Sequence, residues 1–156
     1  MRSTCVYLIK NGQWLMLLRN RKKNDVNHGK WIGVGGKCEA AETFEACAKR
    51  EVNEETGLLV HSLTPCGIVS FVYDHQEPET IAVYVCDDFT GELQECDEGT
   101  LAWIREDRIL DLELWEGDRV FLKKMLARER EPFHLELHYD EAGNLIQVLE
   151  ITGENL

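Results

Sequence analysis

Residues 36–58 read GKCEAAETFEACAKREVNEETGL, and this stretch decides the fold. Its dense part predicts a helix with both ends marked. Thr43 can cap the start, and Glu45 lies in the first turn, where negative charge suits the helix dipole. Gly57 follows the last turn, where a left-handed residue is favoured. We therefore expect a helix that begins after Thr43 and ends at Gly57.

The charges on this helix lie on the side expected to face the core. At about 100° per residue, Glu51 and Glu55 extend the stripe that Phe44 and Ala48 begin, and Glu54 lies at its margin. Three carboxylates are thus expected to point inward at one end of the helix. Such a cluster is costly unless a cation is present, and a hard divalent cation suits an all-oxygen site. The cluster predicts Mg²⁺ rather than Zn²⁺, with Mn²⁺ as the alternative metal.

The competing interpretation is an ordinary salt-bridged helix. Arg50 could neutralise Glu54 four residues further on. One arginine cannot balance three carboxylates, so this pair does not account for the cluster.

The spacing of the stretch resembles the Nudix box, GX5EX7REUXEEXGU with U aliphatic, and matches it at every defined position. These positions are Gly36, Glu42, Arg50, Glu51, Val52, Glu54, Glu55, Gly57 and Leu58. The resemblance implies an α+β fold: an α/β/α sandwich with a mixed β-sheet, in which the box forms a loop–helix–loop.

Composition indicates one globular domain over residues 1–156, including a C-terminal hairpin at about 133–151. No apolar run approaches the length of a membrane span and no signal peptide is expected, so the protein is predicted to be cytoplasmic. The six cysteines form no C-x-x-C pair and are read as reduced thiols. A net charge of −12 argues against polymeric nucleic acid and anionic membranes as partners. The basic segment 19–37 instead favours a small anion.

The rest of the chain predicts strands around this helix and a second helix. Asn11-Gly12 favours a type I′ turn within a hairpin over residues 3–19. The C-terminal hairpin would cover a sheet edge or form a dimer contact, which leaves monomer and homodimer both open. The other expected elements are strands at 58–61 and 67–73 with a break at Pro65, a strand at 81–86, a loop at 87–99, a strand at 101–104 and a helix at 118–130.

The resemblance also implies roles for individual residues. The metal would be held by the Gly35 carbonyl, Glu51, Glu54 and Glu55, with Glu98 completing the site or assisting the attacking water. Arg50 would orient the carboxylates, and Glu42 would pair with it or fix the loop. The phosphates would be held by Arg19 and by Lys37 beside Gly36.

Flanking segments are similar to the MutT-type 8-oxo-dGTP diphosphatases. They are KWIGVGGK before the box, EGTLAW and WEGD. This similarity implies that Trp115 stacks on the base and Asp118 hydrogen-bonds to it. The plainer alternative is that Trp115 packs in the core and Asp118 caps a helix. Relatives that read the oxidised purine can carry Asn where this chain has Ile32, which cannot hydrogen-bond a base through its side chain, so a broader or different substrate stays open.

The implied reaction is Mg²⁺-dependent cleavage of a small nucleoside triphosphate to the monophosphate and pyrophosphate. With 8-oxo-dGTP as substrate, the role would be sanitation of the nucleotide pool, a form of DNA repair. Two alternatives stay open. The same site could cleave ADP-ribose, a nucleotide sugar or ordinary NTPs, or the domain could be a non-catalytic nucleotide sensor. An intact box argues against the sensor.

Overall fold

The computed structural model describes residues 1–74 and 76–151. Strands dominate, and two α-helices and one 3₁₀-helix interrupt them. In chain order the elements are β1 (Arg2–Lys10), β2 (Gln13–Leu18), β3 (Trp31–Ile32), α1 (Phe44–Thr56), β4 (Leu59–Tyr73), β5 (Glu79–Thr90), β6 (Thr100–Arg105), η1 (Glu106–Asp111), α2 (Glu116–Leu126), β7 (Phe133–Tyr139) and β8 (Leu145–Glu150).

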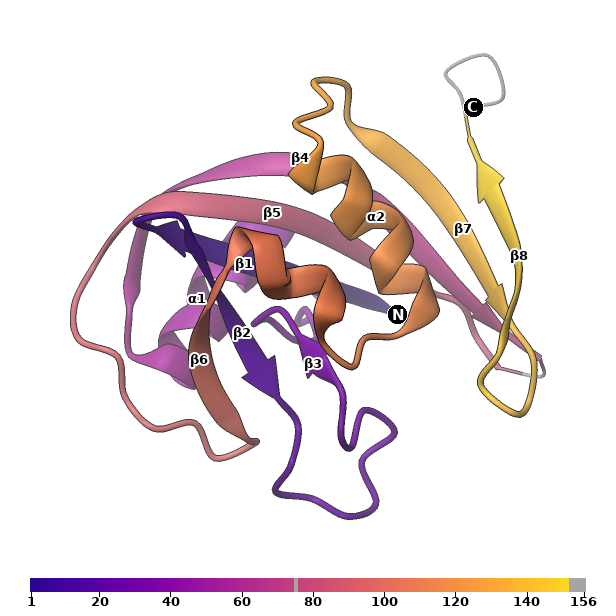
Figure 1. Cartoon of the computed structure of the whole chain (residues 1–156), viewed down its shortest axis with the longest axis horizontal. Coiled ribbons are helices and arrows are strands. Elements are labelled where there is room, and N and C mark those ends of the chain that lie inside the picture. Colours follow the sequence, from indigo (N-terminus) through magenta and orange to yellow (C-terminus); the bar gives the residue numbers. More distant parts are fainter. Residues whose placement is uncertain (75, 152–156) are drawn as a thin grey trace.

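One mixed sheet of eight strands forms the centre of the molecule (Figure 1). Its order is β3-β2-β1-β5-β4-β7-β8, and β6 pairs with β2. Strand β1 runs parallel to β5, and β4 runs parallel to β7. The remaining pairs are antiparallel. The predicted α+β class and mixed sheet are confirmed.

Each face of the sheet carries its own helix and hydrophobic cluster. Tyr7 belongs to the cluster that includes residues of α2, whereas its neighbours Val6 and Leu8 belong to the cluster that includes residues of α1. Such alternation follows from the two-residue period of a strand. The result is the expected α/β/α sandwich, with α1 and α2 on opposite faces.

The helix of the box has the ends that its sequence predicts. The Thr43 hydroxyl oxygen accepts from the amide of Ala46 at 3.1 Å. Gly57 ends the helix with a φ of 78°, in the left-handed region. The predicted hairpin at residues 3–19 is also present, since Asn11 and Gly12 both have positive φ and Ile9 pairs with Trp14.

Three predicted boundaries are wrong. Pro65 does not break a strand: β4 runs through it from Leu59 to Tyr73, because shifts of register on β5 accommodate the irregular stretch. Strand β5 continues to Thr90, into the segment expected to be a loop. Helix α2 spans residues 116–126 rather than 118–130, and Trp115 rather than Asp118 is its N-cap residue.

The C-terminal hairpin extends the sheet. Strand β7 pairs with β4, and β8 lies at the edge beyond it (Figure 1). The hairpin therefore covers one edge of the sheet and presents a new one. None of the helices in the described part of the chain is long and apolar enough to cross a membrane. All six cysteines are free thiols.

Candidate active site

Glu55 differs from Glu51 and Glu54 on α1 because Arg50 does not hold its carboxylate. Its Oε2 atom is buried and has no hydrogen-bond partner within the described part of the chain. Burial, together with the negative charges of Glu98 and Glu51, raises the pKa of Glu55 to about 8. Leaving a buried acceptor without a partner costs free energy, so a proton or a cation would stabilise this atom.

Arg50 holds the neighbouring carboxylates in place. Its guanidinium donates to Glu42 at 2.7 and 2.8 Å, to Glu51 at 2.8 Å and to Glu54 at 3.2 Å. This pairing lowers the pKa of Glu42 to about 2. Burial nevertheless raises the pKa of Glu51 against the effect of Arg50. The expected pairing of Glu42 with Arg50 is therefore present.

A second arginine reaches the same cluster from the end of β2. Arg19 donates to Glu98 and to Asp25, each at 2.7 Å, and its side chain is only 16% exposed. Arg19, which is predicted to contact phosphate, is therefore already paired with two carboxylates in this structure. The two guanidinium groups pair with five carboxylates and Glu55 lies beside them, so six carboxylates exceed two arginines by four negative charges when all are ionised. The six are Asp25, Glu42, Glu51, Glu54, Glu55 and Glu98.

The glycines before α1 allow the backbone to approach this cluster. A Cβ on Gly36 would lie 2.5 Å from the Glu51 carboxylate, and one on Gly35 would lie 2.0 Å from the Thr4 carbonyl oxygen. The Gly35 backbone lies beside Glu55. The Gly36 carbonyl accepts from the Thr4 amide at 2.9 Å, whereas no hydrogen bond to the Gly35 carbonyl is found in residues 1–74 and 76–151. Of the two carbonyls, that of Gly35 is the one left available to a metal.

The expectation of three inward carboxylates is correct for Glu51 and Glu55 and wrong for Glu54. The Glu54 side chain is 57% exposed, as its place at the margin of the stripe allows. Among the described residues, no three acidic, histidine or cysteine side chains converge into a ready-made metal site. The two arginines already engage several of the oxygens. Lys37 is exposed, and its carbonyl accepts from Arg50 at 3.1 Å.

The other predicted residues lie around the start of α2. Trp115 is half-buried, and its indole N–H donates to the Asn27 side chain at 2.8 Å. Asp118 is 7% exposed and makes no hydrogen bond or ion pair within the described chain. Burial raises the pKa of Asp118 to about 7, and the charge of Lys30 opposes this rise. Trp115 is therefore only partly buried and is hydrogen-bonded through its indole. Asp118 is a buried carboxylate without a direct partner in the described chain.

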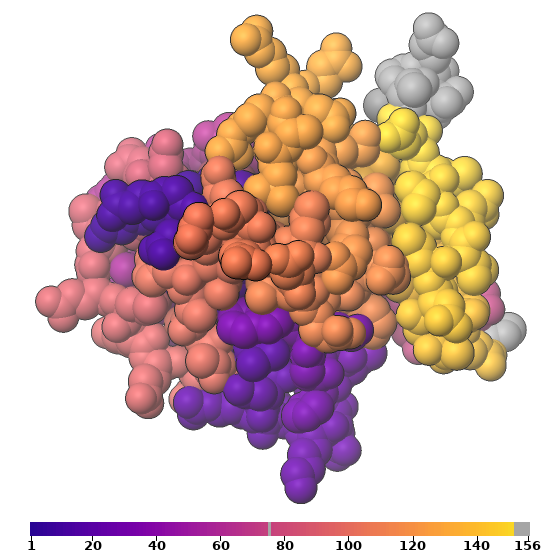
Figure 2. Space-filling model, in the orientation of Figure 1, coloured from indigo at the N-terminus to yellow at the C-terminus, as the bar shows by residue number. Residues whose placement is uncertain are grey.

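The two groups of residues meet at the loop between β2 and β3. The Arg19 amide donates to the Lys30 carbonyl at 3.0 Å. Arg19 reaches Glu98, whereas Lys30 places its ammonium 5.0 Å from the centre of the Trp115 ring. In the space-filling view, this violet loop lies against the orange segment that leads into α2 (Figure 2). One small molecule could therefore contact both groups.

Sequence reasoning did not single out Lys30 or Asn27. Both lie in the basic segment 19–37, between the first hairpin and the box. No motif marks them, because their contacts with Trp115 join segments about 85 residues apart in the chain. Ile32, where relatives can carry Asn, packs with the cluster under α1.

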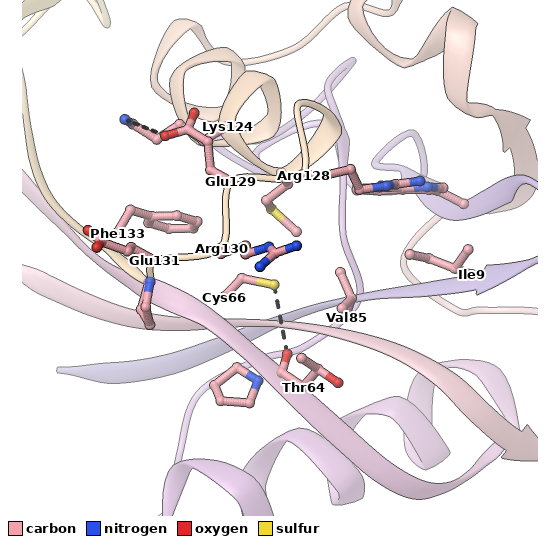
Figure 3. A pocket seen from close by; sticks show the side chains of 14 residues that line it. Ile9, Thr64, Cys66, Val85, Lys124, Arg128, Glu129, Arg130, Glu131 and Phe133 are labelled. Carbon is pink, nitrogen blue, oxygen red and sulfur yellow. Dashed lines mark hydrogen bonds and ion pairs between the residues drawn. The ribbon is translucent and has the colours of Figure 1, made fainter.

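A pocket of about 340 Å³ lies away from these residues, at the C-terminal end of α2 (Figure 3). Ile9, Val85 and Phe133 contribute apolar walls, and Arg128 and Arg130 lie at its border. None of the predicted site residues lines it. The candidate active site is therefore defined by its carboxylates and not by this pocket.

Comparison with known proteins identifies the class. Residues 1–125 match the NUDIX domain, and the chain belongs to this family. It is a MutT-like Nudix pyrophosphohydrolase, an enzyme class whose members generally use divalent metals.

Individual relatives show which members of the family this chain resembles. The chain is 33% identical over 128 residues to an oxidized purine nucleoside triphosphate hydrolase of Danio rerio, covering 81% of this chain and 80% of that protein. Identity to the mouse protein of the same description is 34%, over 73% of this chain and 74% of that one. The crystal structure of a MutT protein from Bacillus halodurans superposes with a TM-score of 0.85 at 27% identity, covering 96% of both chains.

Proposed function

We propose that this protein hydrolyses 8-oxo-dGTP to the monophosphate and pyrophosphate with Mg²⁺ and so sanitises the cytoplasmic nucleotide pool. Residues 1–156 act as one Nudix domain in this proposal. Support for that extent comes from β7, which pairs with β4, and from the coverage of the Bacillus halodurans protein.

The observation that carries the proposal is the unpartnered, buried Oε2 atom of Glu55 within an excess of negative charge. The residues present fit a hard divalent cation, because the donors are carboxylate oxygens and the free Gly35 carbonyl. Glu51, Glu54, Glu55 and Glu98 would hold it with Gly35. A bound cation would neutralise diphosphate charge, lower the pKa of the attacking water and favour the ionised form of Glu55.

The chain's own residues supply orientation and proton transfer. Arg50 fixes Glu51 and Glu54 through the hydrogen bonds described above, with Glu42 bracing its other side. Glu98, or a carboxylate of the α1 cluster, accepts the proton of the water. Arg19 lies close enough to the cluster to exchange its bond to Glu98 for one to a phosphate oxygen.

Lys37 and Gly36 complete the phosphate site. The exposed Lys37 ammonium would act as a point charge for the phosphate chain. Gly36 keeps space beside Glu51 that a side chain would fill.

The choice of substrate rests on the region around α2 and on the relatives. Trp115 offers an aromatic face and Asp118 a buried carboxylate for the base. Two relatives are described as oxidized purine nucleoside triphosphate hydrolases. Ile32 cannot hydrogen-bond to a base through its side chain, so the test also includes nucleoside diphosphate derivatives other than oxidised purine nucleotides.

The test is product release from 8-oxo-dGTP, dGTP, GTP, ADP-ribose and UDP-glucose, with Mg²⁺ and with EDTA. We expect pyrophosphate release to be fastest with 8-oxo-dGTP and to stop with EDTA. A preference for ADP-ribose or UDP-glucose would retain the chemistry of the carboxylates and reject the proposed base site. Tight nucleotide binding without turnover of any compound would identify a sensor.

A further inference from the structure

Lys30 is a lysine held in a defined position. Its amide donates to the Asn27 carbonyl at 2.9 Å, and its carbonyl accepts from the Arg19 amide. Its Nζ atom lies 3.2 Å from Glu113 Oε1, and the side chain is 25% exposed. The next residue along, Trp31, donates its amide to the Glu113 carbonyl at 2.9 Å, which fastens the two segments together. Backbone hydrogen bonds thus hold the main chain of Lys30, and Glu113 holds its ammonium.

The ring beneath this ammonium is equally fixed. Lys30 Nζ lies 5.0 Å from the centroid of Trp115, within the range of a cation–π contact. The Trp115 indole donates to Asn27, the same residue whose carbonyl accepts from Lys30. Tyr139 approaches Trp115 edge-on, with ring centroids 5.9 Å apart. The Trp115 ring and the backbone of Lys30 are therefore both held by hydrogen bonds to Asn27.

Asp118 supplies the opposite chemistry at the same place. It follows Trp115 by three residues on the first turn of α2, where residues so spaced are neighbours. Its carboxylate is buried and unpaired in the described chain, and its pKa responds to the charge of Lys30. An ammonium can only donate hydrogen bonds, and an ionised carboxylate can only accept them. A donor and an acceptor thus lie near one aromatic ring.

That pairing matches one class of base. A guanine-type edge presents the O6 acceptor beside the N1–H and N2–H donors. An adenine-type edge presents the N6–H donor beside an acceptor nitrogen, which is the reverse order. Against adenine the ammonium would face a donor, and leaving such groups unpaired away from water is costly. Ile32 offers no alternative hydrogen bond.

We propose that Lys30 is a specificity-determining residue that donates to the base carbonyl oxygen, beside the base N–H groups from which Asp118 accepts in the function proposed above. The inference rests on the function proposed above and names its substrates as guanine-type nucleotides, oxidised or not. The ammonium leaves the face of Trp115 when the base stacks there and binds the edge of the base instead. Adenine-type nucleotides are rejected by the same charge.

The experiment measures binding of dGMP, 8-oxo-dGMP and dAMP by isothermal titration calorimetry without metal, so that it does not depend on catalysis. Lys30→Met keeps the aliphatic stem and removes the charge, and Lys30→Arg keeps the charge. Lys23→Met is the matched control, because Lys23 is an exposed lysine of the same loop. Thermal unfolding of each variant confirms that it is folded.

We expect the unaltered protein to bind dGMP at least about tenfold more tightly than dAMP. Lys30→Met should lower that ratio about tenfold, Lys30→Arg should retain most of it, and Lys23→Met should leave it unchanged. An unchanged ratio in Lys30→Met, or no preference for dGMP in the unaltered protein, overturns the proposal. A guanine preference in a protein that releases no pyrophosphate from triphosphates would contradict the proposed function alone.

Discussion

Glu55 on α1 and Asp118 on α2 are both carboxylates buried against the central sheet, one on each face. Burial raises the pKa of both, to about 8 for Glu55 and to about 7 for Asp118. Their surroundings differ. Glu55 has other carboxylates as neighbours, which raise its pKa further, whereas Asp118 has the cation Lys30 nearby, which opposes the rise.

The difference separates two kinds of site. A crowd of carboxylates with too few arginines needs additional positive charge, so the region of Glu55 suits a divalent cation. The region of Asp118 has one lysine, Lys30, against two carboxylates, Asp118 and Glu113, so its excess charge is much smaller and it suits a neutral group with its own donors and acceptors. A nucleotide bound with a metal has both kinds of part. Substitutions at the two positions should therefore have different consequences.

The largest effect is expected for Glu55→Gln. Loss of the charge should reduce turnover by about 10²–10⁴-fold, the range typical of removing a group that handles a proton. The fold should stay intact, because the change relieves repulsion with Glu51 and Glu98. Steady-state kinetics and circular dichroism check the two parts. A variant that loses its folded spectrum would show that Glu55 is structural.

Asp118→Asn should stabilise the protein at alkaline pH. The folded state favours protonated Asp118, so its contribution to stability is present below pH 3.8 and is lost as pH rises through about 7. Because each unit of pKa difference corresponds to about 1.4 kcal/mol, the gain at pH 8 should be a few kcal/mol. Urea unfolding at pH 8 and pH 5 measures it.

Glu42→Gln is the control of opposite sign for that measurement. Arg50 lowers the pKa of Glu42 to about 2, so its contribution is present above pH 4.5 and is lost as pH falls through 2. Glu42→Gln should therefore be less stable than the unaltered protein at pH 8. A gain for Asp118→Asn that is no larger at pH 8 than at pH 5 would contradict a raised pKa of Asp118.

Asp118→Ala should alter base selectivity more than catalysis. Loss of one base contact is expected to reduce the preference for 8-oxo-dGTP over dATP by about tenfold, while kcat for the better substrate changes little. The ratio of kcat/KM values for the two nucleotides measures this. An unchanged ratio would mean that Asp118 does not read the base.

The smallest effect is expected for Tyr7→Phe. The Tyr7 hydroxyl is buried and makes no hydrogen bond of ordinary geometry in the described chain, although the Cys5 thiol and the Gly33 backbone lie beside it. Removing it should leave the free energy of unfolding unchanged or raise it by up to about 1 kcal/mol, because an unpaired buried group is lost. Urea unfolding tests this, and a clear destabilisation would reveal an ordered water or other partner at the hydroxyl.

Local sequence signals predicted the parts of the fold that depend on local physics. The ends of α1 follow from Thr43 and Gly57, and the first hairpin follows from Asn11-Gly12. Pro65 misled because its place in a strand depends on the register with β5, which no local signal records. The parallel pairing of β1 with β5 was not predicted for the same reason.

The same contrast applies to the candidate site. The box placed Glu51 and Glu55 together because they lie on one helix, at positions set by its period. The ion pair of Arg19 with Glu98 and the contact of Lys30 with Trp115 join segments distant in the chain. Their residue types alone could not show which loop charges are solvated and which are held against the site.

The central claim is that the carboxylates around Glu55, and not the carboxylate of Asp118, bind a divalent cation. Electron paramagnetic resonance of free Mn²⁺ during titration measures this directly in the unaltered protein, Glu55→Gln and Asp118→Asn. We expect the unaltered protein and Asp118→Asn to bind Mn²⁺ alike, with Mg²⁺ competing, and Glu55→Gln to bind it at least about tenfold more weakly. Equal binding by Glu55→Gln, or loss of binding in Asp118→Asn, would contradict the account.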